Sequence, residues 1–141
     1  MKKVLLFLNL LGEDWRSRPW WMSLIFYFCL YMTFIYMPFD FFLKPVEIDQ
    51  EIWLGYTLTG WWAKATEPLH WIIYGFGAYG FRRMKTWMWP WASVYVAQIV
   101  ISMFVWNILN DRGDLLTAVI SSSIFSIPMI ALWLSRRKFV G

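Results

Sequence analysis

Glu67 and His70 are the residues of this chain with the clearest chemical potential, and they stand three positions apart. On a helix this spacing puts a carboxylate and an imidazole on one face, as in the ligand helices of di-iron carboxylate bundles. A dinuclear site needs a second such pair, and the chain has only one histidine. Glu47, Asp49 and Glu51 could add oxygens to a single ion. We interpret Glu67 as a favourable acidic residue in a first helical turn and His70 as an interfacial side chain, and we assign no metal site.

A hydrophobic cofactor is a second use for this region. One imidazole suffices to ligate haem or chlorophyll. Dense Trp, Tyr and Phe side chains could line a slot for a quinone, a carotenoid, a chlorophyll or a lipid, with His70 and Tyr74 as the candidate polar contacts. The chain has no Ser-His-Asp set and no HExxH motif, so we do not expect an enzyme.

The composition requires a membrane around these residues. Of 141 residues, 60% are hydrophobic, and 12 are Trp and 12 are Phe, whereas a soluble domain averages roughly 45–50% apolar residues. A soluble domain of this length has no interior large enough for so many rings. The net charge is +4, but the basic residues flank apolar runs, which indicates membrane orientation rather than binding to nucleic acid. We predict one integral membrane domain over 1–141.

Four apolar stretches predict an all-α, four-transmembrane-helix bundle with spans at about 20–42, 66–84, 91–109 and 115–134. About twenty helical residues cross the ~30 Å hydrocarbon core. The second stretch has only thirteen apolar residues, Leu69 to Phe81, and reaches full length when it is extended to both sides, with Thr66 as its N-cap. Pro38 is expected to bend or end the first span. Residues 43–65 are predicted to form an outer, Trp-rich loop.

Basic residues gather at alternate ends of the four stretches. By the positive-inside rule both termini are cytoplasmic, in what we expect to be a bacterial inner membrane. Ten of the 13 Lys and Arg residues then share the cytoplasmic side: Lys2, Lys3, Arg16, Arg18, Arg82, Arg83, Lys85, Arg136, Arg137 and Lys138. An additional span over 48–65 would put three of these residues outside, and we reject it on those grounds.

The N-terminus imitates a secretory signal peptide. Its apolar core, Val4 to Leu11, is only eight residues long, and charged residues follow where small residues should mark a cleavage site. We therefore predict that residues 1–15 are retained as a short interfacial helix.

Small residues indicate where the helices pack. The G-x-G-x-x-G pattern of Gly75, Gly77 and Gly80 lies inside an apolar segment, so we interpret it as helix packing rather than dinucleotide binding. The short polar turn before residue 115 makes the last two spans antiparallel neighbours, with Ser93, Ala97, Gln98, Ala118, Ser122 and Ser126 as the predicted packing residues. No span carries a charge at its centre, which counts against active transport.

These observations favour a non-catalytic, accessory or structural subunit of a larger integral membrane complex. Its partners would be other membrane subunits, in a hetero- or homo-oligomer, and lipids. Docking is assigned to the tryptophans of the outer loop, Trp53, Trp61 and Trp62. A binder of a hydrophobic cofactor and a small oligomeric channel or facilitator stay open as alternatives.

Overall fold

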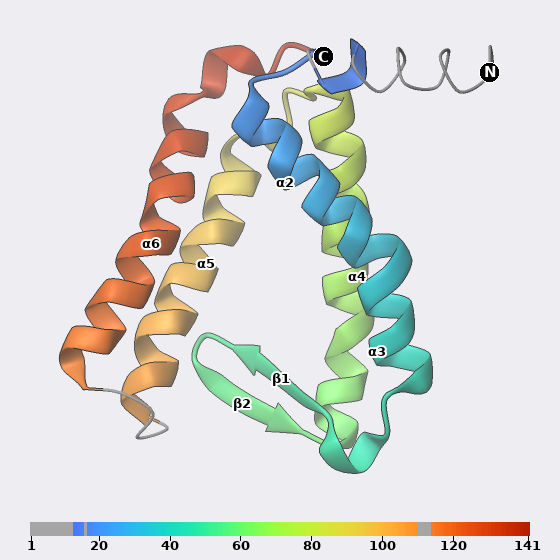
Figure 1. The fold of residues 1–141 in the computed structure, drawn as a ribbon, viewed down its shortest axis with the longest axis vertical. Coiled ribbons are helices and arrows are strands. Elements are labelled where there is room, and N and C mark those ends of the chain that lie inside the picture. The colour runs from blue at the N-terminus through green and yellow to red at the C-terminus, as the bar shows by residue number, and fades with distance from the viewer. Residues whose placement is uncertain (1–12, 16, 110–113) are drawn as a thin grey trace, which may run out of the picture.

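The computed structural model describes residues 13–15, 17–109 and 114–141, which form helices and one β-hairpin (Figure 1). Among these residues, three helical stretches are long and apolar enough to cross a membrane: Trp20–Leu43, Met88–Leu109 and Leu115–Leu134. The prediction of a helical protein with helices suited to a membrane is therefore confirmed. Residues 1–12 of the predicted interfacial helix, and residues 110–113 of the predicted turn, lie outside the described residues.

The first long helix continues through Pro38. It consists of α2 (Trp20–Tyr31), a π-helical segment η1 (Met32–Tyr36) and α3 (Met37–Leu43). A proline has no N–H to donate to the preceding turn and its ring crowds that turn. The wider π-helical turn directly before Pro38 gives the ring room, so the helix ends at Leu43 and not at the proline.

Three further helices follow, and the first of them starts earlier than predicted. They are α4 (Trp61–Arg83), α5 (Met88–Leu109) and α6 (Leu115–Leu134), and a short 3-10 turn η3 (Arg136–Lys138) comes after them. Gly60, with a φ of 59°, directly precedes α4. Thr66 is therefore not an N-cap: it lies in the second turn of α4, where its hydroxyl donates to the Ala63 carbonyl at 2.9 Å. α4 is less apolar than the other long helices, because glycines, tryptophans, a proline and a histidine as well as charged residues interrupt its apolar positions.

The predicted outer loop contains regular structure. A 3-10 turn leads into two antiparallel strands: η2 (Val46–Ile48), β1 (Gln50–Trp53) and β2 (Tyr56–Thr59). Leu54 and Gly55 link the strands and both have positive φ, 51° and 90°, as a two-residue type I′ turn requires. A Cβ on Gly55 would lie 2.3 Å from Cβ of Val105. The tip of the hairpin therefore packs directly on α5, and only glycine fits there.

The long helices form two pairs. In one pair α5 and α6 run antiparallel, and the Ser93 hydroxyl donates to the Met129 carbonyl at 2.8 Å. In the other pair α2 and α3 lie along α4, where the Trp71 indole donates to the Thr33 carbonyl at 2.8 Å. The pairs approach each other at the end that carries the start of α2 and the C-terminus, and they diverge toward the other end, where the hairpin lies between them (Figure 1).

The closed end is held by backbone as well as by side chains. Arg18, just before α2, donates to the carbonyls of Phe81 and Arg82 at the end of α4. The last residue, Gly141, donates to the Met84 carbonyl at 2.9 Å and accepts from the Thr86 amide at 3.1 Å. The main buried cluster of apolar residues lies at this end and includes Met22, Phe26, Phe81, Met84, Met88, Leu132 and Phe139. The start of α2, the α4–α5 turn and the C-terminus are therefore neighbours.

The three glycines of α4 differ in how closely they are approached. A Cβ on Gly80 would lie 2.1 Å from Sδ of Met88, and one on Gly77 would lie 3.1 Å from Sγ of Cys29. A Cβ on Gly75 would make an ordinary contact, 3.9 Å from Cγ2 of Thr33. Gly77 and Gly80 thus permit close packing, whereas a larger residue would fit at position 75.

We predict opposite effects of alanine at two of these positions. Gly80→Ala should lower the free energy of unfolding by about 1–3 kcal/mol, because the methyl group overpacks against buried Met88. Gly75→Ala, the matched control, should raise it by up to about 1 kcal/mol through better helix propensity. Thermal unfolding in detergent, followed by circular dichroism, measures both. Equal losses in the two variants would contradict the packing described here.

Candidate functional site

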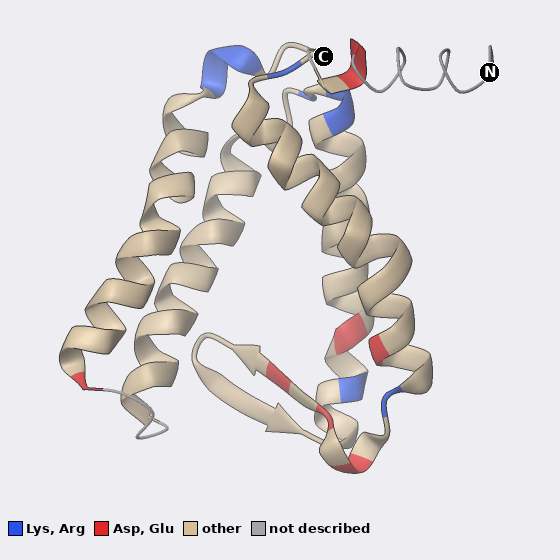
Figure 2. Ribbon diagram, in the orientation of Figure 1, with Lys and Arg blue, Asp and Glu red and all other residues tan. Residues whose placement is uncertain are grey.

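Charged residues lie close together at the end of the molecule where α3, the hairpin and the start of α4 meet (Figure 2). Three of them are almost fully buried: Asp40, Asp49 and Glu67 are 2%, 1% and 0% exposed. Burying carboxylates is costly unless they are paired. We name the group the charged cluster, and it consists of Asp40, Lys44, Asp49, Glu51, Lys64, Glu67 and His70.

Three elements supply these residues. Lys64, Glu67 and His70 recur every three positions along α4, so one face of the helix presents them all. Asp40 comes from the last turn of the first long helix, and Asp49 and Glu51 come from the start of the hairpin. The cluster therefore exists only because the hairpin folds back over α4.

Two lysines hold the centre of the cluster. The Lys64 ammonium lies 3.2 Å from Oδ2 of Asp49 and 3.1 Å from Oε1 of Glu67, and it also donates to the backbone carbonyl of Asp40. The Lys44 ammonium lies 2.6 Å from Oδ1 of Asp49 and 2.9 Å from Oδ1 of Asp40. Burial alone would raise the pKa of Asp49, but its contacts with Glu67 and the two lysines outweigh burial and lower that pKa to about 2. Asp49 is thus an anion at neutral pH.

His70, interpreted from the sequence as an interfacial side chain, has two partners within the protein. Its ring stacks on the Trp53 indole, with centroids 4.2 Å apart and planes 4° apart. Its Nδ1 lies 3.0 Å from Oε2 of Glu51. The hairpin brings both partners to the imidazole, which sequence spacing could not show.

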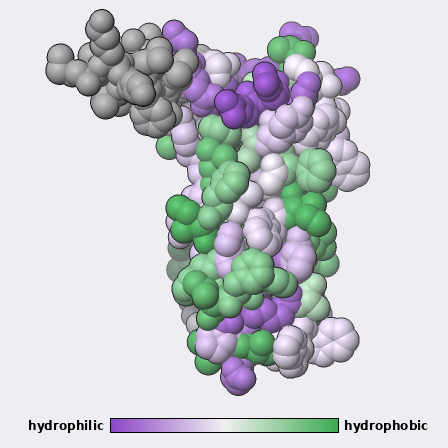
Figure 3. Space-filling view, turned by 90° about the vertical axis from the view of Figure 1, so that its right-hand side faces the viewer, coloured by the Kyte–Doolittle hydropathy of each residue, from purple (hydrophilic) through white to green (hydrophobic). Residues whose placement is uncertain are grey.

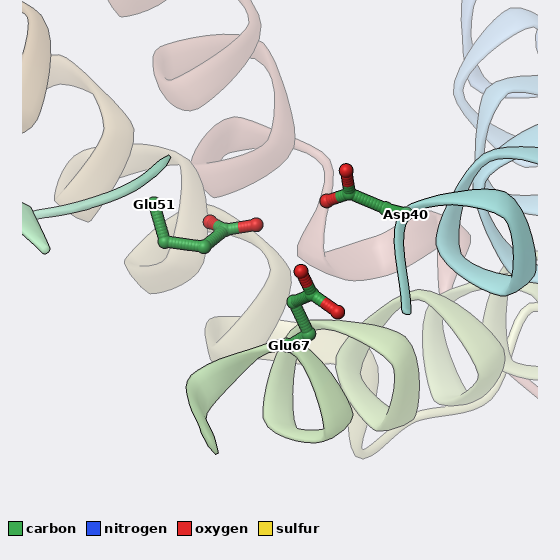
Figure 4. A group of neighbouring side chains, drawn as sticks. All are labelled: Asp40, Glu51 and Glu67. Carbon is green, nitrogen blue, oxygen red and sulfur yellow. The ribbon is translucent and has the colours of Figure 1, made fainter. Parts of the chain in front are cut away.

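Carboxylates from α3, β1 and α4 converge in the cluster. Figure 4 shows the side chains of Asp40, Glu51 and Glu67 directed toward one another. One oxygen of each lies within 4.8 Å of the others. Of the candidate oxygen donors named from sequence, Glu51 and Glu67 meet here, Asp49 is engaged by lysines, and Glu47 is exposed.

A second feature, an apolar cavity of about 570 Å³, lies between the two helix pairs. Side chains of α2, α4, α5 and α6 line it, and nearly all of them are apolar. The polar groups among the lining residues belong mainly to Tyr74, Tyr95 and Gln98. The two tyrosine hydroxyls lie 3.4 Å apart, and the Gln98 amide donates to the Ser102 hydroxyl at 2.8 Å. Of the two cofactor contacts named from sequence, Tyr74 lines this cavity, whereas His70 contacts the hairpin.

The predicted packing residues of the last two helices have different environments. Ser93 is buried against α6, and Ala97 lies beside it in a shallow hollow between the two helices. Ala118 is fully buried. Ser122 and Ser126 instead donate to carbonyls of their own helix, at 2.8 Å and 2.9 Å.

Near the end that carries the hairpin, α5 and α6 make a polar contact that was not predicted from the sequence. Buried Asn107 donates to the Ser121 hydroxyl at 3.0 Å. An amide near the end of an apolar stretch was the available signal.

The three predicted docking tryptophans differ in their exposure. Trp61 and Trp62, at the start of α4, are 78% and 77% exposed. Trp53 is partly buried on His70. Only the first two are therefore available to a membrane surface or a partner.

No protein-family model, curated protein or solved structure matches this chain. The cavity and the charged cluster are therefore the features that indicate a function.

We predict that Lys64 is essential to the fold of the end that carries the hairpin. Lys64→Met should lower the free energy of unfolding by about 3–5 kcal/mol, because it leaves buried carboxylates without their counter-charge. Lys138→Met, at an exposed lysine on η3, is the control and should change it by less than about 0.5 kcal/mol. Chemical denaturation in detergent measures both. Similar losses in the two variants would show that the buried pairs contribute nothing specific.

Proposed function

We propose that this protein holds a lipid-like molecule within the membrane, in the cavity between its two helix pairs. The ligand class is a long hydrocarbon chain with a small hydrogen-bonding head, as in a phospholipid or an isoprenoid quinone. The observation that carries the proposal is the cavity, which the protein's own side chains leave unfilled. It is lined by α4 and by the three helices that are long and apolar enough to span a membrane.

The size and lining of the cavity support an apolar occupant. Its volume, about 570 Å³, falls within the roughly 300–1,000 Å³ typical of ligand pockets. Water would find few hydrogen-bonding partners on such walls. An empty space of this size would cost the lining residues their dispersion contacts. A hydrocarbon chain restores those contacts without a polar penalty.

The polar groups of the cavity support a ligand with a small head. Tyr74 on α4 and Tyr95 on α5 face each other across the space between the pairs, with hydroxyls 3.4 Å apart. Gln98 follows on α5 one turn after Tyr95. A quinone carbonyl or a lipid ester can accept hydrogen bonds from such hydroxyl and amide groups.

The proposal includes four membrane crossings with both termini in the cytoplasm of a bacterial cell. The α4–α5 turn lies beside the start of α2 and the C-terminus, so α4 returns the chain from the far end of α3. The 23 residues of α4 extend about 34 Å, enough for the hydrocarbon core. On the face of the molecule drawn in Figure 3, hydrophilic residues lie at the two ends and apolar residues lie between them.

We predict that residues 47 and 138 lie on opposite sides of the membrane. In a Cys29→Ala background, which removes the only cysteine, a membrane-impermeant maleimide should label Glu47→Cys in intact spheroplasts. Lys138→Cys should react only after the membrane is permeabilised. Both positions are exposed, so reaction of both in intact cells, or of Lys138→Cys alone, would overturn this orientation.

A role as a subunit of a larger membrane complex is the second candidate. The exposed indoles of Trp61 and Trp62 favour it, because aromatic side chains are enriched where protein interfaces are buried. The same pair suits a membrane interface, so it supports the subunit role less directly than the cavity supports lipid binding.

We predict that filling the cavity displaces the ligand. Ile99 on α5 lines the cavity, and Ile99→Trp should lower the amount of co-purified lipid or quinone several-fold. Ile127→Trp, on the exposed face of α6 and outside the cavity, is the matched control and should retain wild-type levels. Native mass spectrometry after mild detergent extraction measures bound small molecules and distinguishes phospholipid from quinone.

The same spectra report co-purifying polypeptides, which would support the subunit role. A cavity that is free of lipid and quinone in the wild-type protein would overturn the binding proposal.

A further inference from the structure

One oxygen of Asp40 is buried without a partner. Oδ1 of this carboxylate pairs with Lys44 at 2.9 Å, whereas Oδ2 makes no hydrogen bond with any described residue. The side chain is 2% exposed, so bulk water does not solvate that oxygen. An unsatisfied buried group of this kind costs free energy comparable to a lost charged hydrogen bond. Figure 4 shows the carboxylate directed toward Glu67 and Glu51.

The cluster as a whole has unbalanced charge. Four carboxylates, those of Asp40, Asp49, Glu51 and Glu67, face the ammonium groups of Lys44 and Lys64. The carboxylates of the cluster thus outnumber its ammonium groups by two. A single dication would balance this excess.

The spacing of the carboxylates suits such an ion. Three atoms within 4.8 Å of one another share a centre at most about 2.8 Å away, and Ca²⁺ takes oxygens at about 2.3–2.6 Å. A shift of a few tenths of an ångström therefore brings all three onto one ion. Each carboxylate has lone pairs for more than one partner, so Glu67 can contact Lys64 and a metal together.

We propose that Asp40, Glu51 and Glu67 bind one divalent cation of the hard, oxygen-preferring class, Ca²⁺, Mn²⁺ or Mg²⁺. The ion would join α3, β1 and α4, and so clamp the hairpin onto the helices. His70 acts as a positioning residue: its Nδ1 lies 3.0 Å from Oε2 of Glu51, and stacking on Trp53 fixes its ring. The site does not depend on a ligand in the apolar cavity.

The test uses the full chain, purified in detergent and stripped with EDTA, with Mn²⁺ alone as the probe. Loss of the free Mn²⁺ signal in electron paramagnetic resonance should show about one bound ion per chain. The midpoint temperature of thermal unfolding should rise when Mn²⁺, Ca²⁺ or Mg²⁺ is added. Asp40→Asn and Glu67→Gln should each weaken Mn²⁺ binding about tenfold or more.

Glu47→Gln is the matched control, because Glu47 is exposed at the same end of the molecule and the substitution removes the same charge. It should bind Mn²⁺ like the wild type. Glu51→Gln, on the partly buried strand β1, keeps the test decisive if the buried variants do not fold. Absence of a bound ion at millimolar Mn²⁺, or equal affinity in Glu51→Gln and Glu47→Gln, would overturn the proposal.

Discussion

The end of this protein that carries the hairpin depends on the buried contacts of Lys64 with Asp49 and Glu67. They connect α4 to the loop that enters the hairpin, and the same ammonium group reaches the carbonyl of Asp40 at the end of the first helix. Ions in so apolar a molecule are tolerated only where they compensate one another. Residues 43–65 are therefore held against α3 and α4 and do not form a free loop.

The position of the hairpin determines the shape of the membrane region. Its tip, at Gly55, packs on Val105 of α5, while Trp53 stacks on His70 of α4. The hairpin thus lies between the two helix pairs at one end. At the other end, the Arg18 side chain and the Gly141 backbone make the hydrogen bonds that join the chain. The apolar cavity lies between these two closures. The cavity and the charged cluster are consequently two outcomes of one fold.

Helix packing follows local rules that the sequence could indicate. Two glycines of α4 and a serine of α5 mark close approaches: Gly77 against Cys29, Gly80 against Met88 and Ser93 against Met129. Ser122 and Ser126 carry the same pattern yet bond to their own helix. A small-residue pattern shows where a backbone can be approached, and the partner that approaches depends on the rest of the fold.

The sequence by itself determined the membrane character and the three most apolar helices, because hydropathy and helix length are local properties. It placed the start of α4 too late and treated residues 43–65 as a loop, since Lys64 and Glu67 look like surface charges until their partners are known. Only the tertiary structure brought Asp40, Asp49 and Glu51 to α4 and left an apolar space between helix pairs. Both depend on contacts between segments far apart in the chain, which local pattern does not encode.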